Sequence, residues 1–256
     1  MKVTILGCGG SGGVPLIGDD WGQCDPKNPK NRRLRASILV EAEDTALLVD
    51  TSPDMRQQFL NHRIRHIDAV LYTHAHADHI HGIDELRPVN RLMERDIDIY
   101  ADRATLDAIG QRFGYVLEPL APEAKGFYYK PCLAPHEIDG PFSVNGIDIV
   151  PFTQGHGFMD TLGFRFGPAA YSTDVVELSD YAFKALQGVE VWIVDCLRER
   201  PHVTHAHLEK TLAWIERVAP KRAILTHMNH EVDYQTFKAR LPAGVEPAYD
   251  GLVVEV

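Results

Sequence analysis

The sequence lacks any hydrophobic run long enough to cross a bilayer, and its N-terminal segment lacks the apolar region of a secretory signal. We therefore expect a cytoplasmic protein with no membrane segment. Positive charge is also scarce, because 26 Lys and Arg residues face 36 Asp and Glu residues and leave a net charge of −10. Binding of long nucleic acid depends on clustered Lys and Arg side chains. Such a partner is therefore not expected.

Cysteines are few and lie far apart, at Cys8, Cys24, Cys132 and Cys196. This spacing indicates reduced thiols in the cytosol and argues against a disulfide framework. Internal repeats and low-complexity segments are also missing from the sequence. With 45% apolar residues in 256 positions, the chain can bury a sizeable core, and we expect a single domain over residues 1–256.

Strands and helices are predicted in succession along most of the chain. Apolar runs predict strands at residues 36–41, 45–50, 68–72, 97–100, 162–166, 169–172, 189–194 and 223–226, and a hairpin within 142–152 that turns at Asn145-Gly146. Helices are predicted at residues 55–62, 80–93, 101–113, 208–218 and 234–241. We expect Ser52 to cap the first helix and Pro88 to interrupt the second, and no regular structure over residues 118–141. This succession predicts a layered fold in which helices cover sheets.

Histidine, with 13 residues, is abundant, and it gathers in the stretch Thr73–His79 directly after the apolar run 68–72. The alternation of an extended chain turns His74 and His76 to one side. The next two candidate ligands, at positions 78 and 79, open a predicted helix and therefore face another way. This cluster predicts a metal site, although the alternative is a set of ordinary polar loop residues.

Further candidate ligands follow three other predicted strands, at His156, Asp174 and His227. Seven ligands exceed the four of a tetrahedral zinc ion, so two divalent metal ions are expected. The economical division gives three ligands to each metal and one shared aspartate: His74, His76 and His156; Asp78, His79 and His227; and Asp174. Imidazole-rich sites favour zinc, manganese or iron over calcium or magnesium. Zn²⁺ or Mn²⁺ is the expected cofactor.

Three further features lie near these strand ends. The glycine-rich segment 7–15 contains G-x-G-x-x-G, but the turn-rich residues that follow do not predict the helix that a dinucleotide-binding site needs. In the basic loop 25–35, Arg33 or Arg35 could hold a phosphate, or the whole loop could be solvated. Asp50 ends a strand at the edge of the histidine cluster, where it could orient a ligand.

The motif His74-x-His76-x-Asp78-His79, with the later His156, Asp174 and His227, resembles the signature of the metallo-β-lactamase superfamily. The resemblance implies an αββα four-layer sandwich with a dinuclear metal site at one edge of the two sheets. The Gly-Val-Pro loop, the Arg-rich entry to the second strand and several strand ends are similar, more narrowly, to the PhnP-like cyclic phosphodiesterase of the carbon–phosphorus lyase pathway and its tRNase Z-like relatives. One departure is a missing cysteine cluster. Only Cys24 and His230 remain at comparable places, so we expect no additional structural zinc.

The resemblance also implies catalytic residues. His205 matches a family position that contacts substrate phosphate and acts as a general acid, and Asp78 is expected to be both a ligand and part of the catalytic machinery. Asn229, close to the ligand His227, is a further candidate for substrate binding, together with Arg35. A homodimer is plausible by the same resemblance.

The leading function is hydrolysis of small, cyclic phosphodiesters to phosphomonoesters by a hydroxide shared between two metals, which also clamp the phosphoryl oxygens. Its partners would be a small phosphodiester substrate and a nucleoside monophosphate product. One alternative is tRNA 3′-end processing, although no long Gly/Lys-rich insertion is visible. Two others are hydrolysis of a thioester or lactone, for which the same site would serve, and a non-catalytic metal-binding scaffold.

Overall fold

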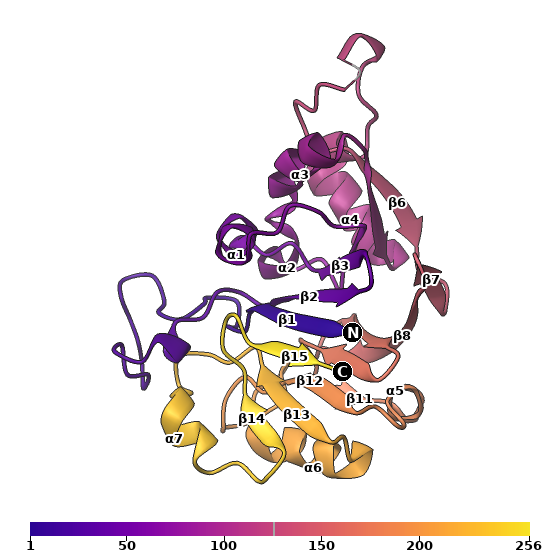
Figure 1. Ribbon diagram of the computed structural model, residues 1–256. Helices are drawn as coiled ribbons and strands as arrows, with labels where there is room; N and C mark the ends of the chain where they lie inside the picture. The colour runs from indigo at the N-terminus through magenta and orange to yellow at the C-terminus, as the bar shows by residue number, and fades with distance from the viewer. Residues whose placement is uncertain (125) are drawn as a thin grey trace.

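The computed structural model describes residues 1–124 and 126–256, and these residues form two β-sheets packed face to face with helices on the outside (Figure 1). The first sheet has the strand order β15-β1-β2-β3-β4-β5-β6. In that order its strands are Val253–Glu255, Lys2–Gly7, Ser37–Ala42, Thr45–Val49, Ala69–Leu71, Ile97–Ala101 and Leu133–Glu137. The predicted αββα sandwich is therefore confirmed.

The second sheet has the strand order β11-β8-β9-β10-β12-β13-β14, with β7 paired to β8. In that order its strands are Glu177–Leu178, Ile147–Gly155, Asp160–Phe166, Ala169–Ser172, Val191–Asp195, Arg222–Thr226 and Val245–Pro247, and β7 is Phe142–Val144. The α-helices α1 to α7 are Met55–His62, Ala77–Ile80, Leu86–Met93, Arg103–Phe113, Asp180–Ala185, Leu208–Val218 and Tyr234–Lys238.

The alternation of side chains along the strands builds the layers. In β3, Leu47 and Val49 face the core between the sheets, whereas Leu48 packs into a second core beneath the helices. The first core also takes Phe164 and Trp192 from the second sheet. Both sides of β3 are therefore buried, as expected in the part of the first sheet, β3 to β6, where neighbouring strands are parallel and helices cover the outer face.

Three sequence predictions were wrong in detail. The helix predicted for 80–93 breaks at Gly82 and not at Pro88, which lies inside the first turn of α3, where its missing N–H costs little. A Cβ on Gly82 would lie 2.0 Å from the Ser52 carbonyl oxygen, so the chain needs glycine there. Ser52 itself is not the cap of α1, which begins after Asp54. Finally, β6 is a strand within the segment 118–141, where no element was expected.

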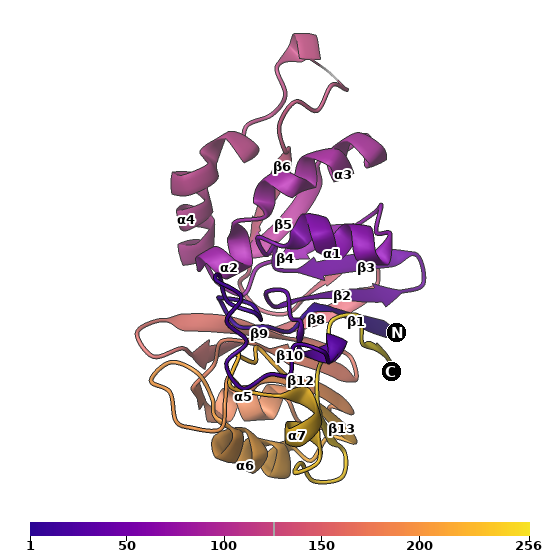
Figure 2. The same cartoon turned by 90° about the vertical axis from the view of Figure 1, so that its left-hand side faces the viewer.

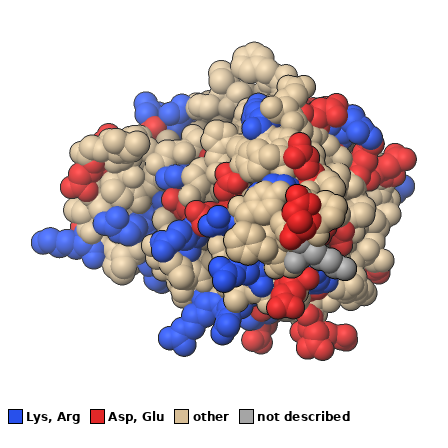
Figure 3. Space-filling model, turned by 90° about the horizontal axis from the view of Figure 1, so that it is seen from above, with Lys and Arg blue, Asp and Glu red and all other residues tan. Residues whose placement is uncertain are grey.

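All four cysteines are buried free thiols, and no described helix is long and apolar enough to cross a membrane. No described helix follows the glycine-rich segment 7–15 directly, which leaves the dinucleotide-binding alternative without support. Lys and Arg are mixed with Asp and Glu on the face seen in Figure 3.

Strand ends gather at one edge of the sandwich. Strands β10, β12 and β13 are parallel, and β8 runs in the same direction because β9 is antiparallel to both β8 and β10. Their carboxyl ends therefore meet at one edge, as do those of the parallel strands β3 and β4 in the other sheet. Three residues just after these strands adopt positive φ angles, Asp50 (64°), Asp174 (52°) and His227 (57°). Such backbone strain in non-glycine residues clusters at functional sites.

Asp250 fixes the glycine-rich segment to the rest of the fold. Its carboxylate accepts the backbone N–H of Cys8 (3.1 Å) and of Leu34 (2.7 Å). Burial raises the pKa of Asp250 to about 7, against the pull of these donors. The folded state therefore holds this proton to a higher pH than the unfolded chain does.

This pKa predicts a pH dependence of stability. Between about pH 4 and pH 7 the unfolded state binds fewer protons at Asp250, so the free energy of unfolding falls as pH rises. We expect a loss of about 1–3 kcal/mol, less than the full pKa shift implies because Asp250 is not completely buried. Urea unfolding of the wild type and of Asp250→Asn, at about pH 4.5 and pH 7.5, isolates this titration. A stability difference that stays constant with pH would contradict the prediction.

Candidate metal centre

The seven predicted ligands lie together at the edge where the strands end. Four follow β4, in the segment that leads into α2 and within that helix, and the others follow β8, β10 and β13. They form two groups whose ligand atoms lie within 4.8 Å of one another: His74, His76, His156 and Asp174; and Asp78, His79, Asp174 and His227. The two groups coincide with the division proposed from the sequence.

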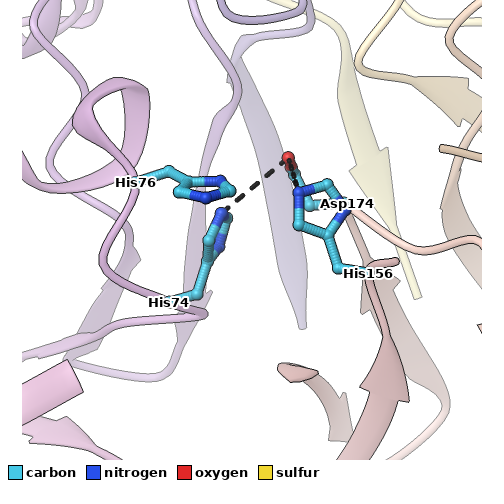
Figure 4. A group of neighbouring side chains, drawn as sticks. All are labelled: His74, His76, His156 and Asp174. Carbon is cyan, nitrogen blue, oxygen red and sulfur yellow. Dashed lines mark ion pairs between the residues drawn. The ribbon is translucent and has the colours of Figure 1, made fainter. Parts of the chain in front are cut away.

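The first group joins the two sheets. Figure 4 shows His74 and His76 pointing across to His156 and Asp174 from the opposite sheet. The Nε2 atoms of His74 and His156 lie 3.9 and 3.7 Å from the same oxygen, Asp174 Oδ1. Ligands about 2.0–2.2 Å from a shared metal ion are roughly 3–4 Å apart, so this spacing fits one ion.

The second group uses the other oxygen of Asp174. The Nε2 atoms of His79 and His227 lie 3.1 and 3.3 Å from Asp174 Oδ2. Asp78 Oδ2 lies 3.3 Å from His79 Nε2 and 3.6 Å from His227 Nε2. Asp174 therefore presents one oxygen to each group, which is the arrangement of a carboxylate that bridges two ions.

Hydrogen bonds leave the inward-facing nitrogens free. His79 donates from Nδ1 to Asp50 (2.7 Å). His74 donates from Nδ1 to the Thr73 hydroxyl oxygen (3.0 Å), and that hydroxyl in turn donates to Asp50. His156 Nδ1 lies 2.7 Å from the carbonyl oxygen of Thr204. Metal-binding histidines are commonly oriented in this way through their second nitrogen. Sequence reasoning anticipated Asp50 in this position but missed Thr73 and Thr204.

Several of the inward-facing nitrogens in the described part of the chain are buried without a hydrogen-bond partner. Among the described residues, the Nε2 atoms of His74, His79 and His227 are buried without a partner. Buried polar atoms are nearly always paired in a native fold, so such orphans require an explanation. Nitrogen and carboxylate donors at tetrahedral spacing fit Zn²⁺ or a similar divalent cation. The residues present therefore fit two metal ions.

The electrostatics of the cluster keep its carboxylates ionised. Burial acts to raise the pKa of Asp174, but His227 and His79 outweigh it and hold the pKa well below its usual value. For His227, burial acts to lower the pKa, but Asp174 and Asp78 raise it to about 9. Burial lowers the pKa of His74 far below its normal range, and His79 adds to this effect. The site thus holds ionised carboxylates beside histidine side chains.

His205 lies beside both groups without belonging to either. Its Nε2 atom is 3.9 Å from Asp174 Oδ1, and its ring stacks on that of His227 with centroids 4.7 Å apart. Its Nδ1 atom lies 2.9 Å from Asp195 Oδ2, at the end of β12, an oxygen that also accepts the N–H of Val175. Sequence reasoning missed this role of Asp195. Asp195 lies at a strand end, as the candidate ligands do, and this position could have indicated its role.

The other residues that were predicted to contact substrate form hydrogen bonds or ion pairs with nearby protein groups. Asn229 Oδ1 accepts the N–H of Glu231, and Arg35 pairs with Asp54 at 3.1 Å. Arg33 does turn inward, but it donates to backbone carbonyls, including that of Val232 at 2.7 Å. The geometry thus gives Arg33 a structural role, while substrate binding by Asn229 and Arg35 stays a prediction.

The fold and the paired groups of histidine and aspartate side chains are those of a metallo-β-lactamase-type protein. A family model described as the β-lactamase superfamily domain matches residues 45–228, and the chain belongs to this family. A structure described as a new diphosphatase from the PhnP family is 34% identical, with a TM-score of 0.91 over 100% of this chain and 97% of that one. The narrower resemblance to the PhnP-like family is thereby confirmed.

Two further proteins are similar to this chain. The structure of human tRNase Z, short form, is 17% identical with a TM-score of 0.72 over 100% of this chain and 99% of that one, and so shares the fold. A protein of Porphyromonas gingivalis named octanoyltransferase is 32% identical over 259 residues, which is 98% of this chain. The chain spans about half (51%) of that relative's length.

The metal content can be predicted from these contacts. We expect two divalent ions per chain after loading with zinc or manganese, measured by elemental analysis of the desalted protein. A third, structural zinc is not expected because Cys24 Sγ donates to the Val232 carbonyl (3.2 Å) and, with His230, offers only two ligands. Cys24→Ser should keep both ions. A third tightly held zinc that Cys24→Ser removes would contradict the prediction.

Proposed function

We propose that this protein is a dinuclear metal-dependent phosphodiesterase that hydrolyses small, cyclic phosphodiesters to phosphomonoesters. The observation that carries the proposal is the Asp174 carboxylate, which presents one oxygen to each of two histidine-rich groups while His205 faces the same carboxylate. When bound, two cations would supply Lewis acidity and lower the pKa of a coordinated water toward about 7.

The chain's own residues supply positioning and a proton. Asp50 and the Thr204 carbonyl hold His79 and His156 with Nε2 directed inward. Asp195 holds His205 by Nδ1, so Nε2 of His205 is the atom directed at the substrate space. A histidine held in this way can donate a proton to the departing oxygen of a phosphate ester.

The similarity to a PhnP-family diphosphatase supports phosphorus chemistry, since the two chains are 34% identical over their whole lengths. Cleavage of a diphosphate and of a phosphodiester both involve attack of water on phosphorus. We therefore extend the proposal to nucleoside and ribose phosphate esters, with Zn²⁺ or Mn²⁺ as cofactor. A cytoplasmic location and a homodimer remain part of the same proposal.

One experiment compares the candidate activities directly. The zinc- or manganese-loaded protein is incubated with a 2′,3′-cyclic nucleotide, a linear dinucleotide diphosphate, a tRNA precursor and an octanoyl thioester, and kcat/KM is compared. The proposal expects the highest kcat/KM on the small phosphate esters. A higher value for the tRNA precursor or the thioester would overturn it. His136→Ala, a remote exposed histidine on β6, serves as the control variant.

A second candidate is hydrolysis of a thioester. The relative named octanoyltransferase favours it, because 98% of this chain aligns with that protein and an octanoyl group is an acyl group. The same metal pair would activate water for attack on a carbonyl carbon. The octanoyl thioester in the comparison above is the substrate that decides between the two functions.

A further inference from the structure

Two loops meet beside the metal centre. The turn between β8 and β9 and the loop between β12 and α6 project on the same side of the molecule (Figure 2). The ring of His156 joins them, since its Nδ1 lies 2.7 Å from the Thr204 carbonyl oxygen. Gly157, with φ at +73°, lets the loops approach so closely that a Cβ there would lie 2.6 Å from Thr204 Cγ2.

These loops carry exposed apolar side chains. Phe158 is 94% exposed, Val203 is 74% exposed and Met159 is 36% exposed. The turn is closed by a hydrogen bond from the His156 N–H to the Met159 carbonyl (2.8 Å), which leaves Phe158 at its tip. Phe158 follows the predicted ligand His156 by two residues, and Val203 precedes His205 by two. We call Phe158, Met159 and Val203 the apolar rim.

The position of the apolar rim indicates what it contacts. A phosphate drawn to the ligand groups would carry its organic substituent to the edge formed by His156 and His205, where the apolar rim begins. An exposed phenyl face can stack on a flat aromatic ring that leaves water with it, and such a pair gains more than its buried area alone. Exposed apolar surface next to a polar site is typical of ligand binding.

We propose that Phe158, with Val203 on the neighbouring loop, is a stacking platform for the base of a nucleotide substrate. This inference rests on the proposed phosphodiesterase function and names its substrate class, a nucleoside phosphate and not a sugar phosphate alone. Stacking tolerates any base because every base has a π-face. Purine and pyrimidine nucleotides should therefore both bind. Phe158 should determine how tightly a nucleotide binds and have little effect on which base is preferred.

The test uses product-like probes that differ only in the base. Binding of AMP, UMP and ribose 5-phosphate to the metal-loaded protein is measured by calorimetry for wild type, Phe158→Ala, Phe158→Tyr and the remote control Leu60→Ala on α1. We expect Phe158→Ala to weaken AMP and UMP roughly 5- to 100-fold, the range for loss of one base stack. Ribose 5-phosphate should be unaffected, and Phe158→Tyr and Leu60→Ala should bind as wild type does.

Several outcomes would overturn the inference. It fails if the wild type binds AMP no more tightly than ribose 5-phosphate, or if Phe158→Ala weakens both ligands equally. It also fails if Phe158→Ala weakens octyl phosphate but not AMP, since the apolar rim would then accept an alkyl chain. The proposed function is tested separately by hydrolysis. Base-dependent binding without phosphodiester hydrolysis would support the platform and reject the enzyme activity.

Discussion

Replacement of Asp174 by asparagine is expected to lower kcat/KM by about 10³-fold or more and to reduce the metal content below two ions per chain. The carboxylate faces both ligand groups, through Oδ1 and Oδ2, so no other described residue can take its place between them. Loss of several kcal/mol of transition-state stabilisation corresponds to this factor. Metal content by elemental analysis and kcat/KM on a cyclic nucleotide are the two measurements.

Asparagine is the informative substitution at this position. Asp174 has φ at 52°, a conformation that asparagine adopts more readily than most residues, so Asp174→Asn removes charge without adding backbone strain. Asp160→Ala, at an exposed aspartate that begins β9, is the matched control and should behave as wild type. Retention of both metals, with kcat/KM within tenfold of wild type, would show that Asp174 does not bridge.

Replacement of His205 by alanine is expected to leave both metal ions bound and to lower kcat by roughly 10²-fold or more, as loss of positioned acid catalysis does. The expectation follows from its geometry, because Nδ1 is held by Asp195 and Nε2 lies 3.9 Å from Asp174 without being needed by either ligand group. Asp195→Asn should show a smaller loss of the same kind, because His205 would remain but lose its orientation.

The leaving group separates acid catalysis from a structural role. A p-nitrophenolate leaves without a proton, so His205→Ala should slow the hydrolysis of a p-nitrophenyl phosphodiester much less than that of a cyclic nucleotide. An equal loss on both substrates would assign His205 to binding. An unchanged rate on both would remove it from the mechanism.

The set of candidate ligands was predictable because its members lie within a few residues after the ends of apolar runs. His156, Asp174 and His227 could be placed at one edge from the order of strands alone, and the structure brings them together. The supporting contacts could not be predicted in the same way. Thr204 reaches His156 across 48 positions of sequence, and nothing local marks a backbone carbonyl as a partner.

The same limit explains the errors in the helices. Gly82 ends a helical turn because the chain passes against the backbone of Ser52, a contact between segments that sequence periodicity does not register. Pro88, which does stand out in the sequence, is harmless because it falls in the first turn of α3. Prediction from local sequence fails here because tertiary contacts determine where the helix breaks.

The origin of the ligands has a consequence for the life of the protein in a cell. His74, His76, Asp78 and His79 leave the first sheet, whereas His156, Asp174 and His227 leave the second. Bound cations would therefore fasten the two halves of the sandwich together, and their binding energy would add to the free energy of unfolding. A shortage of the metal would then lower stability as well as any activity that depends on the bound ions. It would leave the two halves less firmly joined and the chain open to proteases, so that its abundance would follow the supply of the ion.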